Sequence, residues 1–486
     1  RRNRQTLRHF LIRYNPANKP GFLGAKTMSD TIVHSKTLRQ RDMVLFTVSA
    51  ILLLDTLTAA ASVGAPSVIW WIFLGIVFFI PFAMICAEMG CAYPEQGGIY
   101  AWIRDGYGGR WASRATWCYW VNTAVWLPAI FLLFAGVFKQ MFFPDLSLGA
   151  QIGIGVALAW LAVAVNIMTL DIGKWIPNLG AILKVIIFLA VIVGAFSYVG
   201  ENGMANPLTL ETLKPDLGSS IQYIPAIIYG MLGFELVSAG SEEMRDPARD
   251  VPRAIFISGT IIIVLYLLGT IAILTAIPAG DINLVEGLID TLNLFFGHSE
   301  AGKTFVLVLG IGALFTFFSN GVTWALGCNR AAAEAALEGE LPKIFALESK
   351  KLGTPIGAAV LMGLVSTVVL VLYGFLSGSN EDLFWALFAF SAVIFLLPYQ
   401  GMLLTFMKMR VVDADHPRPY AVPGGLGVAR LCALLCMTIL GLSIVLFMYT
   451  PGSGVDWAVL GGVLVTLAIG EVVIRFSENH GKRQQG

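Results

Sequence analysis

Charged residues are scarce in this chain of 486 residues. Only 13% of the residues are Asp, Glu, Lys or Arg, whereas soluble domains carry about 25%. A disordered chain is excluded as well, because such chains are polar and poor in aromatic residues, and this one is 57% hydrophobic and 12% aromatic. The net charge of +1 provides no overall field that would favour nucleic acid as a partner. The composition predicts a polytopic membrane protein.

Cysteine and histidine are also rare, and their positions exclude several kinds of site. None of the six cysteines forms a Cys-x-x-Cys pair, so neither a disulfide framework nor a metal site is indicated. The five histidines lie in predicted termini and loops, so a proton relay inside the membrane would have to use carboxylates or lysine. No Gly-Lys-Ser/Thr motif follows a glycine cluster, and no nucleophile–base pair can be assembled. We therefore expect no cofactor, no metal, no ATP-driven pump and no enzyme.

Long apolar runs dominate the remainder of the chain. Because a helix needs about 20 apolar residues to cross the hydrocarbon core of a bilayer, the sequence predicts an all-α membrane protein with twelve spans. The predicted spans are 42–64, 67–91, 113–138, 149–169, 176–199, 221–241, 254–277, 303–327, 355–376, 383–405, 428–449 and 455–475.

The basic residues predict the orientation of these spans. With both termini inside, 28 of the 32 Lys and Arg residues fall in inner segments, three in outer loops and one, Lys184, within a span. Inner loops carry such an excess of positive charge, so we expect a cytoplasmic (inner or plasma) membrane protein with a cytoplasmic N-terminal segment, 1–41, and a cytoplasmic tail, 476–486. Residues 1–27 are expected to be an extension upstream of a natural start at Met28; the alternative is a basic arm that rests on anionic lipid.

Four ionisable residues stand out within the predicted spans: Asp55, Glu88, Lys184 and Glu235. Each is a functional candidate by default, because a charged group is costly to place inside a membrane.

Spans 1 and 6 both carry features of an interrupted helix. In span 1, Asp55 is followed by small residues as far as Pro66, which suits either a broken helix that lines a cavity or a small-residue stripe for close packing. In span 6, Gly230 and Gly233 precede Glu235, and each glycine weakens a continuous helix. Paired interruptions in the first spans of two five-span halves indicate a transporter site at the interface of the halves.

Four blocks of sequence resemble the amino acid–polyamine–organocation transporters. Residues 87–100, AEMGCAYPEQGGIY, look like the signature of spans 2 and 3 in that family, and parts of residues 233–255 resemble its signature of spans 6 and 7. Residues 329–355 resemble the loop after span 8, and residues 393–399, VIFLLPY, resemble span 10. The bacterial branches that exchange arginine for agmatine and glutamate for GABA are the most similar.

The resemblance implies a specific division of the chain. Two inverted five-span repeats would comprise residues 42–199 and 221–405, with spans 1 and 6 broken at the substrate site as in the LeuT fold. Two further spans, 428–475, would be appended.

The resemblance also implies roles for individual residues. Tyr229 corresponds to an aromatic gate over the substrate, and Trp324 to a tryptophan that lines the same site. Glu235 corresponds to a glutamate implicated in the response to pH. Asn122 and Ser391 are further candidates for contact with the substrate.

Lys184 is similar to a lysine of proton-coupled relatives, whose ammonium group takes the place of sodium in sodium-driven members of the fold. A buried amine can exchange a proton near neutral pH, because desolvation disfavours its charged form. The alternative is that Lys184 extends its side chain toward the membrane surface. Asp55 is a third candidate for proton coupling.

One departure from the family bears on the substrate. Most relatives carry Gly-x-Gly in the broken part of span 1, where free backbone amides hold the α-carboxylate of the substrate. Here Thr58-Ala59-Ala60-Ala61 is predicted to occupy the substrate-binding positions, and alanine resists the positive φ that glycine allows. Asp55 adds negative charge rather than a receptor for a carboxylate. The sequence therefore leaves three possibilities for the substrate: polyamines, other amines, or an amino acid that is exchanged for an amine.

Other charged residues match family motifs but are interpreted as structural or gating groups, paired at helix ends and in loops. They are Glu88, Glu95, Glu242, Glu243, Arg245, Arg249 and Arg253.

The predicted function is secondary-active transport of amino acids or related amines by alternating access, as an exchanger or a proton-coupled symporter. The expected partners are the small substrate, the lipid bilayer and protons. A passive channel is the first alternative, but no polar residues recur as a ring-forming motif. A membrane sensor that binds the ligand without moving it is the second, and against it the sequence offers no appended soluble domain.

Overall fold

The computed structural model describes residues 40–94, 98–168, 172–215, 221, 223–237, 244, 246–349, 354–450, 452 and 454–485. All of these belong to one of the two units into which the chain divides, Thr37–Gly486. The predicted N-terminal extension, together with Glu95, Glu242, Glu243 and Arg245, lies outside the described residues.

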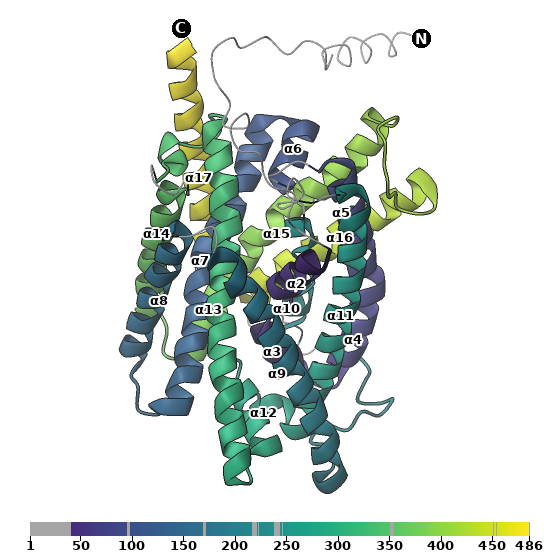
Figure 1. Cartoon of the computed structure of the whole chain (residues 1–486), viewed down its shortest axis with the longest axis vertical. Helices are drawn as coiled ribbons and strands as arrows, with labels where there is room; N and C mark the ends of the chain where they lie inside the picture. The colour runs from purple at the N-terminus through teal and green to yellow at the C-terminus, as the bar shows by residue number, and fades with distance from the viewer. Residues whose placement is uncertain are drawn as a thin grey trace. The chain divides into compact units, whose positions relative to one another are not determined.

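Helices make up nearly all of the described structure (Figure 1). The first half contains α2 (Gln40–Ile51), α3 (Leu54–Ala61), α4 (Pro66–Leu74), a π-helical turn (Gly75–Phe79), α5 (Ile80–Ala92), α6 (Ile99–Tyr107), α7 (Gly109–Phe142), α8 (Leu148–Met168) and α9 (Ile172–Asn202). The second half contains α10 (Ile224–Tyr229), α11 (Pro247–Ala276), a 3-10 turn (Ala279–Asp281), α12 (Gly287–Phe296), α13 (Glu300–Leu337), a 3-10 turn (Lys343–Ala346), α14 (Ile356–Gly374) and α15 (Asn380–Val412). At the C-terminal end follow α16 (Gly425–Met448), the two-residue strands β1 (Tyr449–Thr450) and β2 (Gly454–Val455), which pair antiparallel, and α17 (Trp457–Gln485).

The spans lie where the hydropathy of the sequence predicts them. Among the described residues, ten helices are long and apolar enough to cross a membrane, and the bent pair α2 and α3 makes an eleventh span. The predicted sixth span falls on the shorter apolar segment Ile224–Val237, after which residues 238–243 are not described. The all-α fold is confirmed, and the exact number of twelve spans stays a prediction.

The ends of several helices follow from local sequence. Proline occupies the first turn of α4 and of α11. Backbone N–H groups in a first turn have no acceptor within the helix, so proline, which has no N–H, costs nothing there. The hydroxyls of Ser299 and Ser379 accept hydrogen bonds from backbone N–H groups in the first turns of α13 and α15. These signals set where the long helices begin.

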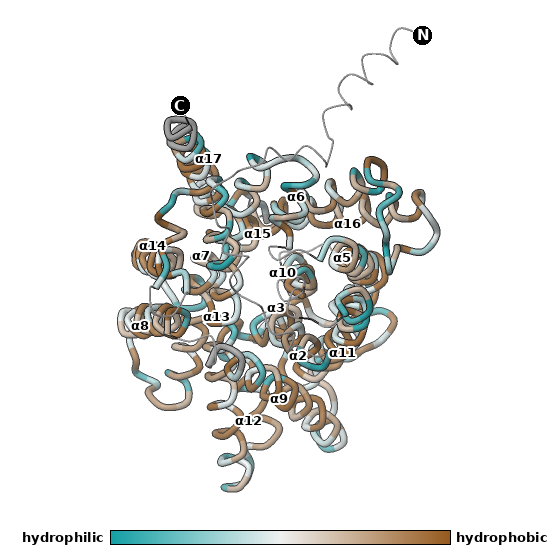
Figure 2. The backbone as a smooth tube through the Cα atoms, turned by 45° about the horizontal axis from the view of Figure 1, so that its top comes forward, coloured by the Kyte–Doolittle hydropathy of each residue, from teal (hydrophilic) through white to brown (hydrophobic). Residues whose placement is uncertain are grey.

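Two short helices, α3 and α10, lie in the interior and are surrounded by the long ones (Figure 2). Every residue of both helices is buried. Hydrophobic residues cover the surrounding helices, whereas hydrophilic residues gather at α6 and at the connection between α15 and α16. That end of the bundle is called the α6 end below, and the opposite end, which carries α12 (Figure 1), the α12 end.

Candidate functional site: two helix breaks around a buried carboxylate

The first break divides span 1 between α2 and α3, which meet at a bend of 47°. Leu52 and Leu53 are not helical, and Leu53 is extended, with φ −112° and ψ 134°. The predicted position of the interruption is therefore wrong, because Thr58 and Ala59–Ala61 lie in the regular helix α3. The break needs no glycine, since no described non-glycine residue has a positive φ and an extended leucine is unstrained.

The second break, in span 6, does depend on glycine. Helix α10 ends at Tyr229, and Gly233 has a φ of +124°, a conformation that only glycine adopts readily. A Cβ on Gly230 would lie 2.5 Å from Cγ2 of Thr56, and one on Gly233 would lie 2.9 Å from Cγ1 of Ile51. The two breaks therefore pack directly against each other, as the paired interruptions predict.

Asp55 lies in the first turn of α3, immediately after the first break, and is only 2% exposed. Among the described residues, neither of its carboxylate oxygens accepts a hydrogen bond. Nearly all buried polar groups in proteins are hydrogen-bonded, and a buried carboxylate is normally paired. The charge of Lys184 acts on Asp55, but no hydrogen bond occupies the carboxylate. Among the described residues, this carboxylate is therefore the strongest indication of a ligand-binding group.

Aromatic rings form a continuous cluster around the second break. Tyr229 contacts Phe388 and Phe395, with ring centroids 4.9 and 5.2 Å apart, and Phe395 contacts Trp324 at 5.4 Å. Sequence reasoning found Tyr229 and Trp324 but missed both phenylalanines of α15. Aromatic faces attract cations electrostatically, so such a cluster suits a cationic ligand.

Helix α7 contributes a second group of polar atoms to this cluster. Asn122 and Trp126 lie one turn apart on α7, and the ring of Trp126 packs edge-on against Trp324 at 6.3 Å. The Oδ1 atom of Asn122 and the Nε1 atom of Trp126 have no hydrogen-bond partner among the described residues. Trp126 was not singled out from the sequence, although its spacing of four residues from Asn122 placed it on the same helix face.

Lys184 is fully buried in α9, at 1% exposure, so the alternative of a side chain that reaches the membrane surface is wrong. Its ammonium group donates to the backbone oxygen of Ser49 in α2, at 2.5 Å, and to Oδ1 of Asn320 in α13, at 3.0 Å. Lys184 thus joins two long helices to the segment that precedes the first break.

Glu235 lies just beyond the second break and is 3% exposed. The hydroxyls of Tyr119 in α7 and Tyr399 in α15 both donate to its Oε1 atom, at 3.0 and 2.7 Å. Sequence reasoning found the carboxylate but neither tyrosine, because each comes from a helix more than 100 residues away.

Two of the predicted contact residues use their hydroxyls within the protein. Thr58 donates to the backbone oxygen of Leu284, at 2.9 Å, and Ser391 donates to the oxygen of Phe388, at 2.8 Å. Leu284 precedes α12, and its N–H donates to Glu381 in α15 at 2.9 Å. Thr58 therefore fixes α3 to the loop that covers it at the α12 end. Beside that loop lies a polar cavity of about 280 Å³, lined by Lys139, Asn283, Val285, Glu286, Ser379, Asn380 and Glu381.

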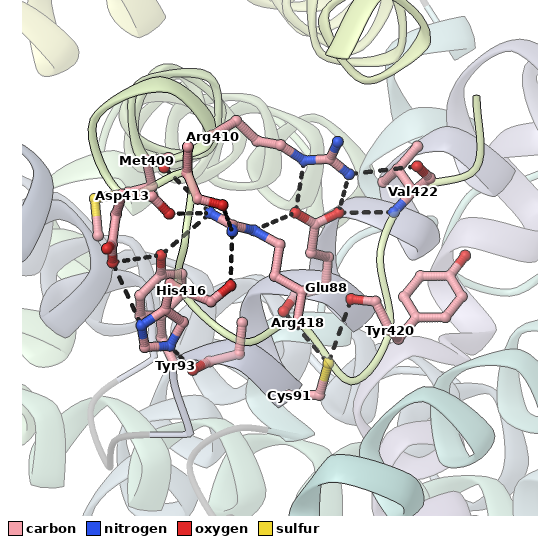
Figure 3. A network of polar contacts seen from close by, with 12 residues as sticks. Glu88, Cys91, Tyr93, Met409, Arg410, Asp413, His416, Arg418, Tyr420 and Val422 are labelled. Atoms are coloured by element: carbon pink, nitrogen blue, oxygen red, sulfur yellow. Dashed lines mark hydrogen bonds and ion pairs between the residues drawn. The ribbon is translucent and has the colours of Figure 1, made fainter. Parts of the chain in front are cut away.

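Glu88 differs from the other buried carboxylates, because the protein neutralises it completely (Figure 3). Arg410 of α15 forms a bidentate ion pair with it, Arg418 approaches its Oε1 to 3.2 Å, and the N–H of Val422 donates to it at 2.7 Å. The Arg418 guanidinium also donates to the backbone oxygens of Met409 and of three residues in the connection between α15 and α16. Glu88 thus fastens this connection to the end of α5, which agrees with the interpretation of Glu88 as a structural group.

The fold and the site together define a class of protein. Two interrupted spans meet in the interior of an all-helical membrane protein, and buried polar side chains converge on the interruptions. This is the arrangement of a secondary transporter.

Comparison with known proteins identifies the family. The model of the amino acid permease family matches residues 38–469, and the chain belongs to this family. A probable agmatine/putrescine antiporter of Lactococcus lactis is 30% identical over 89% of this chain and 93% of its own length. An uncharacterized transporter of Legionella pneumophila is 29% identical over 84% and 90%, and a glutamate/gamma-aminobutyrate antiporter of Lactococcus lactis is 24% identical over 72% and 71%. The protein is thus an amino acid or amine transporter, and the resemblance seen in the sequence is confirmed.

Proposed function

We propose that this protein exchanges small amines across the cytoplasmic membrane by alternating access, with both termini on the cytoplasmic side. The α6 end is then the cytoplasmic end and the α12 end the outer one. The observation that carries the proposal is the carboxylate of Asp55, which is buried at the first helix break without a hydrogen-bond partner among the described residues.

The position of Asp55 favours an amine over an α-amino acid. The N-terminus of a half-helix attracts anions, and in transporters with broken helices it receives the carboxylate of the substrate. Here Asp55 places a carboxylate of the protein in the first turn of α3. Asp55 would repel a second carboxylate brought by the substrate, because like charges repel each other strongly in a medium of low dielectric constant. An ammonium group would instead neutralise Asp55.

The remaining groups of the site fit this assignment. The rings of Tyr229, Trp324 and Phe395 offer faces to a cation. The Oδ1 atom of Asn122 offers an acceptor for the ammonium or guanidinium group at the other end of the substrate. The probable agmatine/putrescine antiporter, whose name gives two cations without a carboxylate, supports the same substrate class.

Lys184 and Glu235 are the groups that would couple protons to transport. Lys184 donates two hydrogen bonds across α2, α9 and α13, and loss of its proton would weaken this connection. Glu235 accepts two hydrogen bonds from α7 and α15, and its protonation would weaken those bonds. Each change acts on contacts between helices that must move relative to one another during alternating access.

Counterflow in liposomes tests the proposal. Purified protein would be reconstituted into vesicles loaded with putrescine, and uptake of labelled putrescine, agmatine, arginine, glutamate and GABA would be measured separately. We expect uptake of putrescine and agmatine that requires the amine inside. Uptake only of the carboxylate-bearing compounds would overturn the choice of amines, and conductance without an internal substrate would indicate a channel.

A further inference from the structure

The break in span 1 has no local cause in the sequence. Residues 51–54 are Ile-Leu-Leu-Leu, and leucine is among the best helix formers. Helices are interrupted at proline, at glycine, at π-bulges, or where a side chain inserts into the ladder of backbone hydrogen bonds. The first three causes are absent from residues 51–54, so a side chain from elsewhere must hold the break open.

Side chains from three other helices satisfy the carbonyls that the break leaves free. In a continuous helix, the oxygens of Ser49, Ala50 and Ile51 would accept from the N–H groups four residues onward. Instead Lys184 donates to Ser49, Trp324 donates to Ala50 at 3.2 Å, and Tyr266 of α11 donates to Ile51 at 2.7 Å.

Tyr266 differs from the other two because it bonds to both sides of the break. Its hydroxyl donates to the oxygen of Ile51 and also accepts from the N–H of Leu53, at 2.7 Å. One hydroxyl thus replaces both the donor and the acceptor that the helix loses between these residues. A continuous helix would instead pair the N–H of Leu53 with Ser49, the oxygen that Lys184 occupies here.

The ring of Tyr266 is fixed in place by its neighbours. It is fully buried, stacks on Trp71 of α4 with centroids 4.8 Å apart and planes at 16°, and meets Phe188 of α9 edge-on at 5.9 Å. Trp71 is itself held by a hydrogen bond of 2.9 Å from its Nε1 to Thr270 of α11. The hydroxyl therefore reaches the break from a rigid support.

We propose that Tyr266 is a positioning residue: its hydroxyl holds the break of span 1 and thereby directs the carboxylate of Asp55 toward the substrate. Asp55 follows Leu53 by two residues, so the direction of its side chain depends on where α3 begins. Without the hydroxyl, Ile51–Leu54 regain their tendency to form a continuous helix. Each residue of a continuous helix is rotated by about 100° from the one before, so even a small extension of α2 reorients Asp55.

The substitution Tyr266→Phe tests this inference, because it removes the hydroxyl and keeps the ring between Trp71 and Phe188. Measuring putrescine uptake by this variant rests on the proposed function, the exchange of amines. There we expect KM for putrescine to rise about tenfold, the effect of one lost hydrogen bond on affinity, while the maximal rate per folded carrier changes less than about twofold.

Tyr373→Phe is the matched control. It removes a hydroxyl that donates to a backbone oxygen, that of Ala458, at 3.2 Å, and keeps a ring stacked on Phe390. KM should be unchanged in this variant. A Tyr266→Phe protein with a normal KM and a maximal rate lowered only by the amount of folded carrier would overturn the inference.

Amide hydrogen exchange on the unsubstituted protein tests the same contact without any transport assay. Leu53 lies outside the helices, yet its N–H should exchange slowly because Tyr266 accepts it. In Tyr266→Phe its exchange should become faster, and in Tyr373→Phe it should not. Rapid exchange of Leu53 in the unsubstituted protein would overturn the inference even if amines are transported; slow exchange in a protein that transports no amine would overturn the proposed substrate class alone.

Discussion

The centre of the bundle and its α6 end each bury a carboxylate, and the two are treated in opposite ways. Asp55 and Glu88 are 2% and 1% exposed. Asp55 accepts no hydrogen bond among the described residues, whereas Glu88 receives two guanidinium groups and a backbone N–H. A buried charge that the protein itself neutralises contributes to structure, and one that it leaves unpaired is available to a ligand.

The largest expected effect is that of Asp55→Asn on transport. Removing one member of a buried charge pair costs about 2–5 kcal/mol or more of binding energy, so uptake of putrescine at low concentration should fall by at least about thirtyfold. The apparent melting temperature without ligand should stay equal or rise, because an unpaired buried charge is removed.

The control for this prediction is Glu300→Gln, which neutralises an exposed carboxylate paired with Lys303 at the start of α13. This variant should change neither the uptake of putrescine nor the apparent melting temperature. A large drop in the melting temperature of Asp55→Asn would show that Asp55 has a structural partner, and the contrast with Glu88 would then fail.

Glu88→Gln should show the opposite pattern, with a large effect on stability. It leaves Arg410 and Arg418 without their counter-ion, and breaking a buried ion pair on one side costs about 3–5 kcal/mol. We expect a lower apparent melting temperature, with KM for the amine unchanged in the carrier that remains folded. Thermal unfolding monitored by size-exclusion chromatography, together with uptake, measures both. A raised KM at normal stability would assign Glu88 to the substrate instead.

The sequence predicted the spans and the candidate carboxylates, and it assigned Glu88 to the structural or gating groups, but it could not show which residues pair with each carboxylate. Hydropathy and charge are properties of one segment, so the helix positions followed from each segment alone. The partners of Glu88 lie more than 300 residues further along the chain, and the hydroxyl that holds the first break comes from a residue 215 positions away. The break in span 6 was located correctly because its cause, Gly230 and Gly233, lies within the segment itself. The break in span 1 was misplaced because its cause does not.

Glu235 is intermediate between Asp55, which accepts no hydrogen bond among the described residues, and Glu88, which two guanidinium groups neutralise. Two tyrosine hydroxyls donate to one oxygen of Glu235. In Glu235→Gln the side chain can still accept those bonds but can no longer exchange a proton. We expect transport to slow and to lose most of its dependence on pH between pH 5 and 8. Initial uptake rates across this range give both values. Full transport with an unchanged pH profile would remove Glu235 from the coupling scheme.

The smallest effect is expected at Glu340, a half-buried carboxylate at the α6 end that accepts a hydrogen bond from Ser113 at 3.4 Å. Burial raises the pKa of Glu340 to about 7, against the opposing effects of the neighbouring Tyr100 hydroxyl and Arg104 guanidinium. The folded state therefore favours the protonated carboxyl. The resulting stability is fully present below the unfolded pKa of 4.5 and is lost as the pH rises through 7.

Glu340→Gln should flatten this dependence. The unsubstituted protein should melt at a lower temperature at pH 8 than at pH 5, and in Glu340→Gln that difference should shrink by a small amount, because solvent screens a half-exposed group. Uptake should not change, since the groups that act on Glu340, such as Ser113 and Tyr100, belong to the α6 end and not to either helix break. If the substitution abolished the pH dependence of uptake as well, the carboxylates of the α6 end would share the coupling role that is assigned here to the centre.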